Sequence, residues 1–211
     1  MNMSKRLPTL ILLSIVYFVL LQTRIGYFIV APIDLLVAFL HEMGHATMCL
    51  LTAGKVESLA VNIDGSGVTS VAGGYMPLVT MGGYIGSCIF SNLLIRYSDT
   101  SGKLISNMIS ISALFASVFW YDNEITTIIL IGYAIAFFII GRFPLSEIIL
   151  QFIGVACVID VLRDFDIGPG SDLKEFTQNV GIFSQTIWMY IWLFICIVVT
   201  AFNMKQILTK S

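Results

Sequence analysis

Two histidines and a glutamate lie together in the stretch His41-Glu42-Met43-Gly44-His45. On an α-helix, residues i and i+4 share one face about 6 Å apart along the axis, so both imidazoles can bind one ion. Zinc accepts neutral imidazole nitrogen and keeps a position for water when it is catalytic. Glu42 can act on that water as a general base. The motif therefore predicts a zinc site for peptide hydrolysis, with zinc-bound water as the nucleophile.

Two features of the sequence strengthen the prediction of a zinc site. His41 and His45 are the only histidines in the chain. They also lie within the apolar segment 29–51, where ionisable groups are expensive and usually functional. The alternative is a structural hydrogen-bonded cluster between helices, but three costly polar groups within five residues would need many buried partners.

A catalytic zinc ion needs a third protein ligand. Without a third histidine the metzincin pattern is excluded, and a carboxylate is expected instead. Asp160 is the first candidate because it lies late in the apolar segment 145–162, where a carboxylate is costly; the alternative is an interfacial residue paired with Arg163 at a helix end. Asp172 is the rival, although Asp172-Leu-Lys-Glu175 is also typical of a helix cap.

Composition places the chain in a membrane. Hydrophobic residues make up 57% of the 211 residues and charged residues only 11%, whereas a soluble domain carries about 25% charged residues. The apolar residues form long runs, which is the pattern that a bilayer selects. We therefore expect an integral, multi-pass protein of the cell membrane. No basic patch indicates binding to nucleic acid, and four scattered cysteines indicate no disulfide framework.

Seven apolar segments are candidate membrane spans. A span needs about 20 apolar residues, and the candidates are 7–22, 28–53, 76–96, 103–121, 125–142, 144–163 and 183–203. The first is short, so six spans are nearly as well supported as seven. In the third, Gly82 and Gly86 form a GxxxG pattern, which favours close packing against a neighbouring helix.

Two intervals between these segments are polar. Residues 54–75 alternate loosely around Asp64-Gly65, which predicts a small β-hairpin. Residues 164–182 contain a Gly-Pro-Gly break, followed by the start of a short helix near Ser171. The fold class predicted is an all-α polytopic membrane protein with six to seven transmembrane helices, a small β-hairpin after the HExxH helix, and one domain over 1–211.

The chain resembles the site-2 protease family of intramembrane zinc metallopeptidases, in its compact, divergent branch without a PDZ or CBS domain. The resemblance rests on Phe39-Leu-His-Glu-Met-Gly-His-Ala46 in a membrane helix, on Gly54-Lys-Val-Glu-Ser, on the Asp64-Gly-Ser-Gly-Val turn and on the Gly-Gly-Tyr-Ile-Gly run. It implies zinc held by His41, His45 and Asp160, with Glu42 as the catalytic residue. Here the aspartate stands in Val-Ile-Asp-Val-Leu, whereas the family often has Leu-Asp-Gly.

The function expected is that of a zinc-dependent endopeptidase that cleaves membrane-embedded or membrane-adjacent segments of another membrane protein, with the lipid bilayer around it. The alternative is a non-proteolytic protein of the same fold that binds membrane partners. Glu42 favours the enzyme, because a binding protein has no need of the base.

Overall fold

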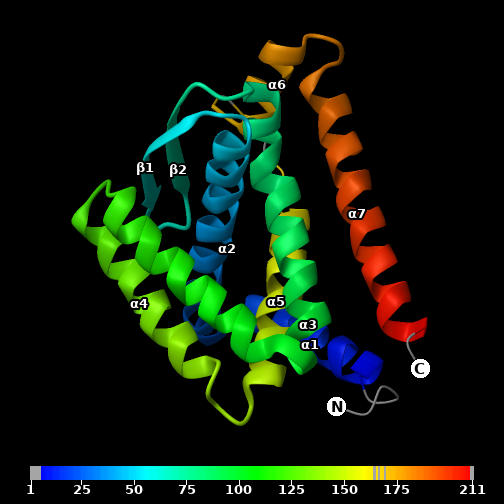
Figure 1. Ribbon diagram of the computed structural model, residues 1–211. Helices are drawn as coiled ribbons and strands as arrows, with labels where there is room; N and C mark the ends of the chain where they lie inside the picture. Colours follow the sequence, from blue (N-terminus) through cyan, green and yellow to red (C-terminus); the bar gives the residue numbers. More distant parts are fainter. Residues whose placement is uncertain (1–5, 164, 166, 169, 210–211) are drawn as a thin grey trace.

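The computed structural model describes residues 6–163, 165, 167–168 and 170–209. This part of the chain forms seven helices and one two-stranded antiparallel hairpin (Figure 1). In chain order the elements are α1 (Arg6–Leu21), α2 (Arg24–Leu51), β1 (Lys55–Val61), β2 (Gly67–Ala72), α3 (Met76–Phe119), α4 (Glu124–Ile140), α5 (Ser146–Arg163), α6 (Asp172–Val180) and α7 (Gln185–Thr209).

The mostly helical fold and the β-hairpin are confirmed. Each of the seven apolar segments forms helix, and the short helix after Ser171 is α6. Among the described residues, three helices are long and apolar enough to cross a membrane, namely α2, α3 and α7. Helices α1 and α4 are apolar but shorter. The expected total of six to seven spans stays a prediction.

Helix α3 joins the third and fourth apolar segments through a kink at Ser101, where the backbone leaves helical geometry (φ −136°, ψ 23°). The buried guanidinium of Arg6 in α1 holds this kink, because it donates to Asp99 and to the carbonyl oxygens of Ile95 and Arg96. These bonds tie the start of α1 to the last turns of α3 before the kink.

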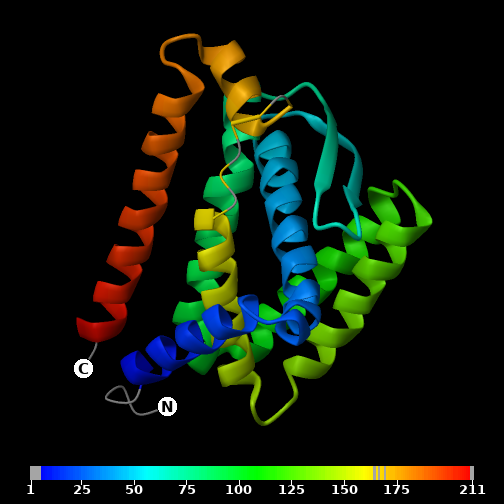
Figure 2. The same ribbon diagram turned by 180° about the vertical axis from the view of Figure 1, so that it is seen from behind.

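Helix α2 lies near the middle of the molecule, between the hairpin and helices α3 and α5 (Figures 1 and 2). It approaches α3 at backbone distance. A Cβ atom added at Gly44 would lie 2.2 Å from the carbonyl oxygen of Gly82, and one added at Gly86 would lie 3.0 Å from the Cα of Gly44. The predicted use of the glycines of α3 in close packing is therefore confirmed, and the partner is the HExxH helix.

The hairpin is fixed to the rest of the fold through β1. The side chains of Val56, Leu59 and Val61 are buried in the main hydrophobic core. The amide of Leu59 donates to the carbonyl oxygen of Trp120, and the amide of Val61 donates to the hydroxyl of Thr126. Strand β2 then pairs with β1 in a register that sets Thr69 opposite Leu59.

Candidate metal centre

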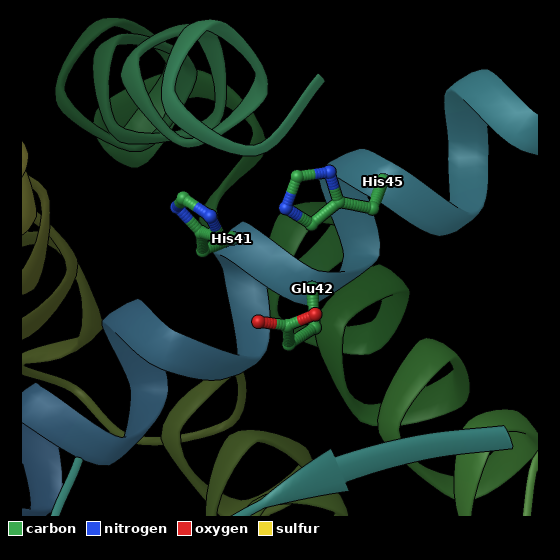
Figure 3. Close-up of side chains that lie close together, drawn as sticks. All are labelled: His41, Glu42 and His45. Atoms are coloured by element: carbon green, nitrogen blue, oxygen red, sulfur yellow. The ribbon is translucent and has the colours of Figure 1, made fainter. Parts of the chain in front are cut away.

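The two imidazoles of α2 and one carboxylate of α6 meet at a single point. Nε2 of His41 lies 2.8 Å from Oδ2 of Asp172, and Nε2 of His45 lies 3.2 Å from the same oxygen. Figure 3 shows both imidazoles on one side of α2. This is the side that faces α3, because a Cβ added at Gly83 would lie within 2.6 Å of Nε2 of both rings.

The hydrogen bonding of His45 favours a cation between its Nε2 and Oδ2 of Asp172. Nδ1 of His45 lies 2.7 Å from the carbonyl oxygen of Val79, so this nitrogen must carry its proton and donate. In a neutral ring Nε2 then presents a lone pair toward the Asp172 oxygen, which also carries lone pairs. The pair is stable only with a proton or a metal ion between the two atoms.

The ligand atoms suit zinc in their chemical type and in their closeness to one another. Bonds of about 2.0–2.1 Å in a tetrahedral arrangement set neighbouring ligand atoms roughly 3.3 Å apart, close to the 3.2 Å between His45 and Asp172, whereas the 2.8 Å between His41 and Asp172 is shorter. Two imidazole nitrogens and one carboxylate are a common catalytic zinc set, and a backbone carbonyl that orients a ligand histidine is its usual support. The residues present therefore fit the metal.

Asp172 lies in the first turn of α6, and a neighbour caps that helix. Ser171 is the N-cap, and its hydroxyl accepts from the amide of Lys174. The Asp172 carboxylate is therefore available to the histidines. Burial raises its pKa, but hydrogen bonds from His41 and from the protonated form of His45 outweigh that effect and hold the pKa well below its usual range.

Asp160, the third ligand that the resemblance implied, lies elsewhere in the cavity. Its carboxylate accepts from the hydroxyl of Tyr17 at 2.5 Å and lies 3.4 Å from the guanidinium of Arg163. It stands near the end of α5, whereas Asp172 is the first residue of α6 and lies against the histidines. The structure thus places Asp172, the rival, against both histidines and pairs Asp160 with Tyr17, while the identity of the third ligand stays a prediction.

Glu42 lies between the histidines in sequence and is 5% exposed. One ligand atom from each of His41, Glu42 and His45 lies within 4.8 Å of the others. The Glu42 side chain points to the hairpin side of α2, where its Oε2 accepts from the hydroxyl of Thr69 at 2.6 Å (Figure 3). The α2–hairpin contact was not expected from sequence, because it depends on the tertiary placement of β2.

A cavity of about 660 Å³ opens onto these residues. Its lining includes His41, Glu42 and Asp172, together with two further carboxylates, Asp34 and Asp160. Carboxylates along its wall favour water over lipid. The cavity can therefore bring water to the centre.

Comparison with known proteins gives one family. The sequence model of a family described as Peptidase M50B-like matches residues 10–203, almost the whole chain. No curated protein and no solved structure shows significant similarity to the chain.

Proposed function

This chain belongs to the Peptidase M50B-like family, and from that premise we propose that it is a zinc-dependent intramembrane endopeptidase. The observation that carries the proposal is the convergence of Asp172 on both histidines, at 2.8 and 3.2 Å, beside the glutamate of the motif. Buried carboxylates and imidazoles are costly in an apolar setting unless they serve a metal or a reaction.

In this proposal His41, His45 and Asp172 hold the ion, and Glu42 is the general base. A bound zinc ion supplies Lewis acidity, which acidifies water and polarises a peptide carbonyl. Glu42 takes a proton from the attacking water and returns it to the leaving amine. The carbonyl of Val79 keeps His45 in the tautomer whose Nε2 faces the centre.

The substrate proposed is a membrane-spanning segment of another protein, cut within or beside the bilayer. Its helix must unwind locally, because helical carbonyls are already hydrogen-bonded and shielded. The chain itself is a membrane protein by its family and its three long apolar helices. We place it in the cell membrane with several spans, α1, α4 and α5 adding to those three.

Zinc per chain tests the ligand set. We expect about one zinc ion in detergent-purified wild type, loss of zinc in His45→Ala and Asp172→Ala, and full zinc in Asp160→Ala. Asp160 and Asp172 are a matched pair, since both are carboxylates that line the same cavity. Zinc loss in Asp160→Ala with full zinc in Asp172→Ala would overturn the assignment, and no zinc in wild type would overturn the metallopeptidase proposal.

Glu42→Gln separates an enzyme from a binding protein of the same fold. The variant should keep its zinc, because Glu42 is not among the proposed ligands, and should cleave at least about a hundredfold more slowly. Cleavage is measured on single-span fusion proteins in liposomes, with Gly or Pro within their apolar segments to ease unwinding. Unchanged cleavage in Glu42→Gln would exclude the proposed role of this residue.

A further inference from the structure

The side chain of Glu42 is held by the β-hairpin. The hydroxyl of Thr69 in β2 lies 2.6 Å from Oε2 of Glu42 and 3.1 Å from the backbone carbonyl oxygen of the same residue. A hydroxyl has a single proton to donate. The carboxylate is the stronger acceptor and lies closer, so it receives that proton in preference to the backbone carbonyl. The glutamate of the motif is therefore bound by a residue 27 positions later in the chain.

A glycine in the same strand makes room for the carboxylate. A Cβ atom added at Gly67 would lie 2.6 Å from both Cγ and Oε1 of Glu42. Gly67 and Thr69 are two residues apart in β2, so they point to the same face of the hairpin. One face of β2 thus contacts the Glu42 side chain at two points.

The strand that makes these contacts is rigidly supported. Thr69 pairs with Leu59, whose side chain is fully buried and whose amide is bonded to Trp120. The terminal torsion of a glutamate is broad, so the plane of its carboxylate is poorly defined without a partner. A fixed hydroxyl removes that freedom, and proton transfer depends strongly on such alignment.

We infer that Thr69 is a positioning residue for the general base, so that the hairpin, and not α2 alone, sets the reactive orientation of Glu42. This inference rests on the proposed function. Thr69 touches neither the metal ligands nor the peptide bond in this assignment, and it acts on the reaction only through Glu42.

The test compares variants that differ by the hydroxyl alone. Thr69→Val keeps the shape and removes the donor, Thr69→Ser keeps the donor, and Ser70→Ala removes an exposed hydroxyl from the opposite face of β2. On the single-span liposome substrates we expect Thr69→Val to lower kcat about 10- to 100-fold, as for other residues that support an active site through a neighbour. KM and zinc per chain should change less than about twofold, because the ligands are untouched.

Two further variants show whether slow cleavage in Thr69→Val comes from the lost hydroxyl or from a misfolded hairpin. Thr69→Ser and Ser70→Ala should cleave at close to the wild-type rate. The inference is overturned if Thr69→Val cleaves as fast as wild type while Glu42→Gln is inactive, or if Thr69→Ser is as slow as Thr69→Val. If wild type leaves every substrate intact, or Glu42→Gln matches wild type, the proposed function fails and the inference fails with it.

Discussion

At the scale of single residues, the candidate centre depends on space left for the imidazoles. Gly83 of α3 faces both histidine rings, and a Cβ there would lie 2.3 Å from Nε2 of His41 and 2.6 Å from Nε2 of His45. The atoms that would have to move are the atoms proposed to hold zinc. A methyl group at this position would therefore displace both imidazoles from the positions in which they are proposed to bind the metal.

Gly83→Ala is accordingly expected to lose zinc while the fold is kept. The rings can turn away from the new methyl group only by leaving the ligand position, and alanine favours helix over glycine by about 1 kcal/mol. Zinc per chain and the thermal unfolding temperature are the measurements. Gly132→Ala in α4 is the control, because a Cβ there meets nothing within 4 Å. Full zinc in Gly83→Ala would contradict the ligand geometry.

Local spacing was enough to predict the pairing of His41 and His45, since i and i+4 on a helix need no tertiary information. The third ligand, a carboxylate, could not be predicted from local spacing. The cost of an intramembrane charge favoured Asp160, and Asp172 had an ordinary explanation as a helix cap. The structure gives the cap to Ser171 and supplies Asp160 with a hydroxyl from Tyr17. The contact of Tyr17 with Asp160 and that of Asp172 with the histidines cannot be read from residue types, because they depend on where α1 and α6 lie in space.

At the scale of elements, α6 carries Asp172 and is anchored by aromatic side chains. Trp192 of α7 is 1% exposed. The centroid of its ring lies 4.9 Å from that of Phe176 in α6 and 6.0 Å from that of Tyr84 in α3. Tyr84 in turn lies edge-on to His41 at 4.8 Å. One tryptophan thus supports α6, which carries Asp172, and through Tyr84 of α3 it also supports the ring of His41.

Trp192→Ala should therefore weaken zinc binding without touching a ligand. Removal of a buried tryptophan costs roughly 3–5 kcal/mol, and if about 1.4 kcal/mol of that falls on the docking of α6, zinc affinity drops about tenfold. Competition with a chelator measures the affinity, and hydrogen exchange reports the opening of α6. Phe194→Ala on the exposed side of the same helix is the control. Equal zinc affinity in both variants would mean that α6 docks independently of Trp192.

The elements themselves were largely predictable, and their mutual contacts were not. Long apolar runs marked the helices, and Asp64-Gly65 marked the hairpin, because both signals are local. The bond from Thr69 to Glu42 needs the register of β2 and the docking of β1 on Trp120 at the same time. Such long-range placement is set by packing, which residue spacing does not encode.

At the scale of the whole molecule, the path of α3 predicts how the chain crosses the bilayer. The helix begins four residues after β2 ends, and the residue after it, Trp120, is bonded to Leu59 of β1. Both ends therefore lie near the hairpin, and the kink at Ser101 is where the chain turns back (Figure 1). The first half, 76–100, is roughly 37 Å long at about 1.5 Å per residue, enough for a bilayer core of about 30 Å.

Single cysteines at Glu57, Asp122 and Lys103 test this path in intact membranes, with a membrane-impermeant maleimide applied to one side at a time. Glu57→Cys and Asp122→Cys lie at the hairpin end and should react from one side, whereas Lys103→Cys, just past the kink, should react only from the other. Wild type is the blank, because its four cysteines are buried. Reaction of all three from the same side would mean that α3 does not cross. The candidate centre would then lie beside the bilayer, and cleavage would be confined to segments at the membrane surface.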